Sequence, residues 1–211
     1  MGKLQNGIND GFIGTVGTAV GYEWRGKWCM RSRPGQVRNP RSEPQQNTRR
    51  RLTLSSKLAS EMIVALRIGM REESLALHIT ECNLFLRLNN EHLGIENGEL
   101  VVDYGRLAVS SGPVAPVGFS QPAMGLERVI TVMFDKNPTD EVVDYHDEVF
   151  LFAYCPETHS SLLAVPSYRY IGFAHIALPE EWSGMQAYLY GFVRDHTGRC
   201  SPSSCLGCVE C

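Results

Sequence analysis

Hydrophobic residues recur every three or four positions between residues 42 and 89, and this spacing predicts two helices. Ser42-Glu43-Pro44-Gln45 fits a capping box, so the first helix is expected to begin at Ser42 and to run to about Gly69. Its expected apolar side consists of Leu54, Leu58, Ala59, Met62, Ile63, Ala65 and Leu66. A second helix is expected from Glu72 to about Asn89, and its expected buried side consists of Leu75, Ile79, Cys82, Phe85 and Leu86.

From Glu99 onward the hydrophobic pattern alternates with a period of two, which predicts strands. Alternating runs occupy residues 100–110, 127–135, 147–156, 160–179 and 185–195. Several short strands without an intervening helical pattern predict an antiparallel β-sandwich of immunoglobulin or fibronectin type III character, although the Cys-Trp-Cys framework of antibody domains is absent. The expected core consists of Leu107, Val109, Ile130, Val132, Phe134, Phe150, Phe152, Tyr154, Phe173, Ile176, Tyr188, Tyr190 and Phe192.

The N-terminal segment has four regularly spaced glycines followed by a bulky/polar alternation, a pattern that predicts a β-hairpin. A glycine-rich phosphate loop would need a preceding strand and a following helix, and neither is indicated. Pro34, Pro40 and Pro44 then predict an extended arm. The expected fold class is therefore α+β: hairpin, arm and two helices in residues 1–98, a β-sandwich in 99–199, and a cysteine-rich tail in 200–211.

Five segments resemble a family of uncharacterised Bacteroidota proteins, known only as a domain of unknown function. GFIGTVGTAVGYEWRGKWCMRSRP resembles its glycine-rich opening, and NPRSEPQQNTRRR resembles the start of its first helix. VVDYGRLAVSSG, DEVFLFAYCPE and LPEEWSGMQAYLYGFVRDHTG resemble its C-terminal strands. The resemblance covers nearly the whole chain and implies no activity. The Asn-Pro-x-Ser segment is also similar, over a short stretch, to tailed-phage structural proteins, and the ending HTGRCSPSSCLGCVEC departs from the family by adding four cysteines.

Charge is divided unevenly along the chain, whose formal net charge is −3. Residues 1–71 hold 13 Lys or Arg against 4 Asp or Glu, whereas residues 72–211 hold 7 against 19. Such a division favours a polyanionic partner or complementary packing between copies, unless the two halves neutralise each other within one molecule. The candidate assembly or anion-binding residues are Trp24, Arg25, Lys27, Trp28, Arg31, Arg33, Arg38, Arg41, Arg49, Arg50 and Arg51.

Four of the seven cysteines, Cys200, Cys205, Cys208 and Cys211, lie within twelve residues at the C-terminus. Their spacing permits a zinc site, although structural zinc sites usually have a longer spacer between their two cysteine pairs. It also permits disulfides within or between copies, or a passive tail. The odd total requires at least one free or intermolecularly paired thiol, and disulfides would indicate an oxidising compartment.

No catalytic constellation is present. The six histidines lack the spacing of a metal-binding helix, and the acidic run around Asp140 and Asp147 is interpreted as a solvated loop. No signal peptide or membrane span is predicted, so the protein is expected to be cytoplasmic by default, or part of an exported or released assembly.

These patterns together predict a non-enzymatic structural subunit. We expect it to assemble head-to-tail into a filament or virion-like particle, with the basic N-terminal arm of one copy on the acidic β-sandwich of the next. The expected partners are therefore other copies of the chain, and no small-molecule substrate is indicated. One alternative is a nucleic-acid-binding protein that uses the basic arm. The other is a protein whose four C-terminal cysteines bind a metal.

Overall fold

The computed structural model describes residues 3–4, 12–33, 35, 41–136, 144 and 146–211. The chain forms two compact units, Met1–Glu43 and Pro44–Cys211, here called the small unit and the large unit. Both helices and antiparallel sheets are present, so the predicted α+β class is confirmed.

The small unit is an antiparallel sheet with the strand order β1-β2-β3-β4. Its strands are β1 (Lys3–Leu4), β2 (Phe12–Val16), β3 (Ala19–Trp24) and β4 (Lys27–Ser32). Gly17 (φ 56°) lies in the turn before β3, and Arg25 (φ 48°) and Gly26 (φ 75°) form the turn after it. Left-handed backbone at such turns suits the twist of a hairpin and costs glycine little. The predicted hairpin is thus part of a longer meander.

Four helices of the described residues lie in the large unit, except that α1 begins at the last residue of the small one. They are α1 (Glu43–Glu61), α2 (Ile63–Gly69), α3 (Arg71–Ala76) and α4 (Glu81–Leu88). α1 begins directly after Ser42, as the capping box predicts. The predicted second helix is split, because Thr80 caps α4 by accepting a hydrogen bond from the backbone N–H of Asn83 (3.1 Å). Each piece therefore has its own orientation.

The described part of the large unit contains three antiparallel sheets. Strands β9 and β13 form the centre of a five-stranded sheet, with β10 and β11 beside β9 and β14 beside β13. Its strands are β9 (Glu148–Cys155), β10 (Ser160–Leu163), β11 (Ser167–Tyr168), β13 (Gln186–Arg194) and β14 (Ser204–Glu210). The others are β12 (Phe173–Ala177), β8 (Val129–Met133) and β7 (Ala123–Met124) in a three-stranded sheet, and β5 (Leu93–Glu96) and β6 (Glu99–Val102) in a hairpin.

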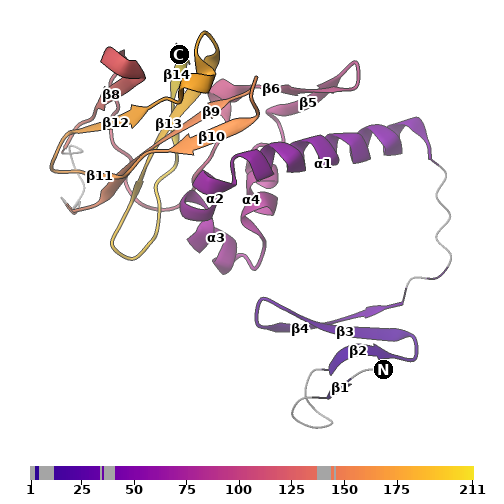
Figure 1. The fold of residues 1–211 in the computed structure, drawn as a ribbon. Coiled ribbons are helices and arrows are strands. Elements are labelled where there is room, and N and C mark those ends of the chain that lie inside the picture. The colour runs from indigo at the N-terminus through magenta and orange to yellow at the C-terminus, as the bar shows by residue number, and fades with distance from the viewer. Residues whose placement is uncertain (1–2, 5–11, 34, 36–40, 137–143, 145) are drawn as a thin grey trace. The chain divides into compact units, whose positions relative to one another are not determined.

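Strands β9 and β13 are buried on both faces, which makes the large unit three layers deep (Figure 1). Their even-numbered residues, such as Phe152 and Tyr190, pack against Leu66 and Phe85 of the helices. Their odd-numbered residues pack against the three-stranded sheet, where Ile130 and Val132 are fully buried. Because strand side chains alternate between faces, one pair of strands serves two hydrophobic cores.

Two expected core residues are exposed instead. Leu75 is 45% exposed, since the break before α4 turns α3 so that Leu84 of α4 is buried in its place. Phe173 is 42% exposed, because β12 directs Ala174 and Ile176 inward and Phe173 outward. Both predictions were wrong because the hydrophobic periodicity was continued across the end of one element into the next, where different positions face the core.

The positions expected as domain boundaries lie inside the large unit. The boundary after residue 98 falls in the β5–β6 turn, where Glu96 pairs with Glu99. Residues 204–210, expected as a tail, form β14 and pair with β13 along most of its length. The helices and the five-stranded sheet share one core, so residues 44–211 form a single compact unit. No helix among the described residues has both the length and the apolarity needed to cross a bilayer.

Candidate assembly surface

The small unit has no hydrophobic core of its own among its described residues. Every buried hydrophobic side chain in the described chain, from Leu58 onward, belongs to the large unit. Among the small-unit residues whose burial is described, only Gly21 is buried, and an added Cβ there would meet the ring and carbonyl of Phe12. A small sheet needs a covered hydrophobic face for stability, and this one leaves its hydrophobic side chains largely in solvent.

One face of the small sheet is apolar, as the register of its strands shows. Gly14 pairs with Gly21, and Gly21 pairs with Met30, so these residues share a face. Met30 is 69% exposed and Val16 is 56% exposed. We call this side the apolar face, and its members are Phe12, Gly14, Val16, Ala19, Gly21, Glu23, Trp28, Met30 and Ser32. An exposed surface of this composition is typical of a protein contact.

The opposite face combines aromatic and cationic side chains. Tyr22 pairs with Cys29, Trp24 with Lys27, and Val20 with Arg31, which places all six on one side. We call this side the cationic face, and Ile13 and Thr15 complete it. Tyr22 and Trp24 are both exposed. The small sheet therefore has an apolar side and an opposite side that carries aromatic and cationic residues.

The structure divides the predicted basic residues between the two units. Trp24, Arg25, Lys27, Trp28, Arg31 and Arg33 lie on or beside β3 and β4, Arg41 precedes α1, and Arg38 lies outside the described residues. Arg49, Arg50 and Arg51 belong to α1 of the large unit. The predicted basic residues therefore belong to two separate structural units.

Two of the α1 arginines make contacts within the large unit. Arg51 Nη2 donates to the carbonyl and to the side-chain oxygen of Asn90, just after α4. The guanidinium of Arg50 lies against Gly98 in the β5–β6 turn, where an added Cβ would come within 2.6 Å of it. These arginines hold α1 against its neighbours. This role was not predicted, because both residues lie in a run of basic residues in the sequence.

The uneven distribution of charge is also found when the charged residues are counted for each structural unit. The small unit holds seven Lys or Arg against three Asp or Glu, a formal charge of +4. The large unit holds 13 against 20, a formal charge of −7. The two units are thus electrostatically complementary, whether they meet within one molecule or between molecules.

The four C-terminal cysteines do not converge. Cys200 is buried beside Ile68, whose carbonyl lies 3.4 Å from its Sγ. A bulge in β14 places Cys205 and Cys208 on the same face, opposite Tyr190 and Tyr188. Cys211 packs against the core on the other face of the sheet. Within the described part of the chain, no three His, Cys, Asp or Glu side chains group as a metal site requires, and all seven cysteines are free thiols.

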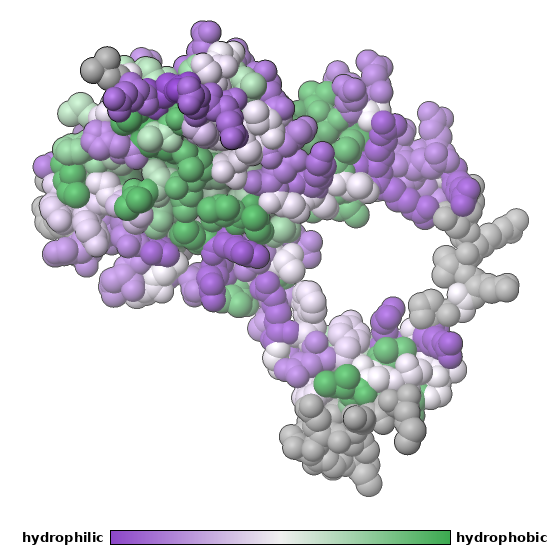
Figure 2. Space-filling view, viewed as in Figure 1, coloured by the Kyte–Doolittle hydropathy of each residue, from purple (hydrophilic) through white to green (hydrophobic). Residues whose placement is uncertain are grey.

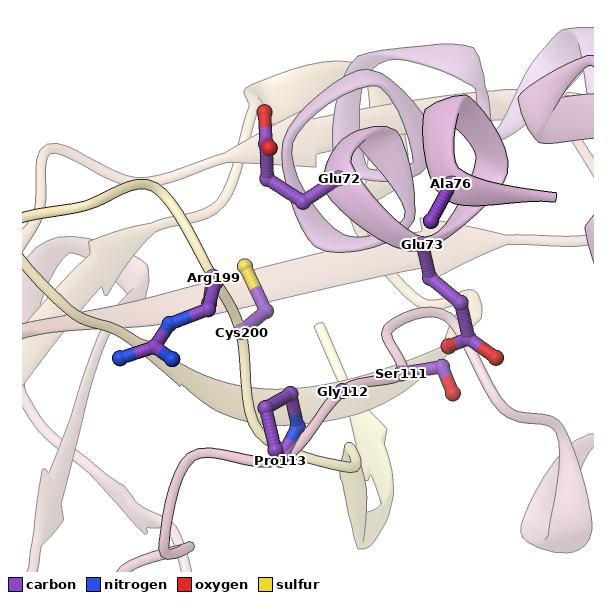
Figure 3. Close-up of a pocket in the computed structure, with 8 residues that line it drawn as sticks. All are labelled: Glu72, Glu73, Ala76, Ser111, Gly112, Pro113, Arg199 and Cys200. Carbon is purple, nitrogen blue, oxygen red and sulfur yellow. The ribbon is translucent and has the colours of Figure 1, made fainter. Parts of the chain in front are cut away.

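A cavity of 580 Å³ opens in the large unit between α3 and two loops (Figure 3). It is lined by Glu72, Glu73, Ala76, Ser111, Gly112, Pro113, Arg199 and Cys200. Burial raises the pKa of the Cys200 thiol to about 12, so this thiol is protonated at neutral pH and is a poor nucleophile. Arg199 is engaged with Asp195 (2.8 Å), while one buried carboxylate oxygen of Glu73 has no partner among the described residues. The described lining of the cavity therefore offers carboxylate hydrogen-bond acceptors and a thiol that is not activated.

A polar cluster around Glu61 joins the helices to the five-stranded sheet, and no sequence pattern predicted it. The Tyr154 hydroxyl donates to Glu61 Oε2 (2.6 Å), and His159 Nδ1 lies 3.3 Å from the same oxygen. Ser161 Oγ donates to the Glu61 carbonyl (2.6 Å). Burial, together with the adjacent carboxylate, raises the pKa of Tyr154 far above its usual value. The phenol therefore stays protonated and acts as a structural donor.

Comparison with known proteins gives one result that bears on identity. The chain matches a family described as "Family of unknown function (DUF6266)" over residues 11–207. No curated protein and no solved structure matches it. The match extends from the small sheet through the helices into β14, and it ends before Cys208. It confirms the resemblance to an uncharacterised family, and the chain belongs to the family of unknown function DUF6266.

Proposed function

We propose that the protein is a non-enzymatic structural subunit that assembles through its small unit. The observation that carries this proposal is the small sheet itself: its described residues form a regular meander, yet bury no hydrophobic side chain. Such a sheet gains stability when its apolar face is covered. A large unit of another copy provides that cover, and the formal charges of +4 and −7 favour the contact.

A contact between unlike surfaces of successive copies is heterologous. It closes into a ring or continues as an open filament, depending on the rotation between copies. A filament or a virion-like particle is the product we propose. The packing of the five-stranded sheet on the three-stranded sheet supports a β-sandwich as the stable module, while an immunoglobulin type, an origin in Bacteroidota and a likeness to tailed-phage structural proteins stay predictions.

The size of the purified full-length chain tests this function. Dynamic light scattering with and without reductant, followed by negative-stain microscopy, is expected to show species much larger than the 23.5 kDa chain. Salt at about 1 M shortens the Debye length to roughly 3 Å and is expected to reduce their size. Persistence of the large species in reductant would assign the contact to surfaces and not to disulfides.

A matched pair of variants locates the contact. Met30→Glu places a charge on the apolar face and is expected to leave only monomers. Val101→Glu places the same charge on β6, where a hydrophobic side chain is also exposed, and is expected to assemble normally. A wild-type protein that stays monomeric at high concentration would overturn the proposal, as would equal effects of the two variants.

Binding of single-stranded nucleic acid is a second candidate function. The cationic face favours it, because Tyr22 and Trp24 could stack on bases beside Lys27 and Arg31, which would contact phosphates. A fluorescent oligonucleotide is then expected to bind with an affinity that falls steeply with salt. The variant Lys27→Ala/Arg31→Ala should weaken this binding, and Met30→Glu should leave it intact. Binding unaffected by Lys27→Ala/Arg31→Ala would exclude the cationic face as the binding surface.

A further inference from the structure

We propose that the surface of the large unit that receives the small unit is the open edge of β10, and that β4 of a second copy adds to it as an antiparallel strand. This inference rests on the proposed function and makes it specific. Strand addition to a sheet edge is an established form of protein recognition, in which backbone hydrogen bonds supply affinity and side chains supply specificity.

β10 is an edge strand with unpaired backbone groups. It is the terminal strand in the order β10-β9-β13-β14. The backbone N–H of Ala164 donates to the carbonyl of Leu151, so residues 160, 162 and 164 face β9. Because inward and outward residues alternate in an antiparallel pair, Ser161 and Leu163 direct their N–H and C=O groups outward, and Val165 continues the series. Among the described residues, no other backbone group bonds to these three.

The β10 edge also lacks protection by charged residues. Natural sheets shield their edges with charged residues, bulges or covering segments, because a free edge pairs readily with other strands. Residues 160–165 read SSLLAV and carry no charge. Val165 is 87% exposed, and Val64 of α2, a helix that contacts β10, is 46% exposed. Figure 2 shows hydrophobic residues gathered on the large unit where Figure 1 places β10 and α2.

β4 of the small unit offers a matching edge. It is the last strand in the order β1-β2-β3-β4. The backbone N–H of Arg33 donates to the carbonyl of Thr18, so residues 27, 29, 31 and 33 face β3. By the same alternation, Trp28, Met30 and Ser32 direct their backbone groups outward. Each edge therefore has three residues, at every second position, whose backbone N–H and C=O groups point outward.

An antiparallel pairing of these edges has a defined register. It places Ser32 opposite Ser161, Met30 opposite Leu163, and Trp28 opposite Val165. Paired residues share a face, and Leu163 lies on the helix side of its sheet. The apolar face of the small sheet would thus continue that side, on which α2 contacts β10. One pairing satisfies both free edges and buries the most exposed apolar side chains of both units.

Charge on the opposite side of the sheet agrees with this register. Arg31 and Arg33 would lie beside Leu162 and Ser160. Ser160 accepts a hydrogen bond from Trp182 Nε1 (2.8 Å), which places this end of β10 near the acidic segment that contains Glu181. Glu157, in the turn before β10, is also exposed. The cations of one copy would meet acidic residues of the next, and this favours a second copy as the occupant.

Intermolecular disulfide trapping tests the register. Met30→Cys is made in one population of the full-length chain and Leu163→Cys in another, both with Cys29→Ser and Cys208→Ser. Residues in a hydrogen-bonded antiparallel pair have Cα atoms about 5.5 Å apart, within the range of a disulfide. Mild oxidation of the mixed populations is expected to give a covalent dimer that contains one copy of each. Leu162→Cys is the matched control, because its side chain points to the other face and should not link.

The outcomes separate this inference from the proposed function. Large species without a link between residues 30 and 163 would overturn the β10 edge and leave assembly standing. The absence of any large species would overturn assembly as well. A link that forms only when both cysteines are in one chain would show that β4 pairs within its own molecule, and would overturn the inference. As a second variant, Leu163→Pro removes one outward N–H without touching the bonds to β9, and it should raise the concentration needed for assembly about tenfold.

Discussion

Arg169 is the most deeply buried charge in the described chain, and its removal gives a sharp test of the large unit's energetics. Its side chain is fully buried, and its partner, Asp147, is 5% exposed. Arg169 Nη2 lies 3.4 Å from Asp147 Oδ2 and donates to the Ala115 carbonyl (3.0 Å). Nε and Nη1 have no partner among the described residues. The pair is therefore desolvated but incompletely satisfied.

The magnitudes follow from this geometry. Arg169→Met leaves the Asp147 carboxylate buried without a partner, and breaking a buried pair in this way costs about 3–5 kcal/mol of unfolding free energy. The double variant Arg169→Met/Asp147→Leu leaves no buried charge. It also relieves two unpartnered N–H groups, each of which costs about 1–3 kcal/mol. We expect the double variant to lie within about 1 kcal/mol of wild type, and thus to be more stable than the single variant.

The pH dependence provides an independent check. Burial raises the pKa of Asp147 even with Arg169 beside it, and loss of the cation raises it further. When folding raises the pKa of a carboxyl group, the free energy of unfolding decreases as pH rises from the unfolded pKa toward the folded pKa. The loss of unfolding free energy caused by Arg169→Met should therefore be smaller near pH 4 than at pH 7.

Urea unfolding followed by circular dichroism measures these differences at both pH values. A single variant within about 1 kcal/mol of wild type would refute the reasoning, because it would mean that Asp147 is solvated or otherwise paired. A double variant as unstable as the single variant would also refute the reasoning. A deficit that is independent of pH would show that the loss arises from packing and not from the carboxylate.

Three further predictions concern other parts of the large unit. Leu84→Ala should cost about 2–5 kcal/mol of unfolding free energy, and Leu75→Ala less than about 1 kcal/mol, because Leu84 is buried and Leu75 is exposed. Equal losses of the two variants in urea unfolding would contradict the break between α3 and α4. Tyr154→Phe should cost about 1.5–3 kcal/mol through loss of the bond to the Glu61 carboxylate, and an unchanged urea midpoint would show that Glu61 is solvated. Iodoacetamide at pH 8 should alkylate Cys208 well before Cys200, because Cys208 is exposed and Cys200 is buried, and mass spectrometry that finds Cys200 modified first in native protein would refute this order.

Periodicity predicted the elements more reliably than their boundaries. The helical spacing around Leu58 and Leu66 and the alternation around Phe152 and Tyr190 both correspond to buried faces. The break before Thr80 was not predicted, since a capping threonine within a helical pattern is a weak local signal. The burial of β9 on both faces was also not predicted, because a continuous run of apolar residues does not indicate which neighbouring element covers each face.

Features that depend on distant contacts could not be predicted from local pattern. Glu61 bonds to Tyr154, 93 positions later in the chain, and nothing near Glu61 in the sequence marks that partner. Arg50 and Arg51 stand in a basic run, so their contacts with the β5–β6 turn and with Asn90 were hidden by composition. The C-terminal cysteines drew attention to metal chemistry, whereas the intervening Leu206 and Val209 carried the hydrophobic signal of a strand.

The pairing of β14 with β13 has a consequence for biosynthesis. This strand covers the outer edge of β13, and it is synthesised after β13. Until residues 204–210 have emerged from the ribosome, β13 has one unpaired edge in the five-stranded sheet, because chains emerge and fold from the N-terminus. A nonsense change at Ser204 should therefore leave a polypeptide that keeps β9 and β13 but is prone to aggregation through the exposed edge of β13.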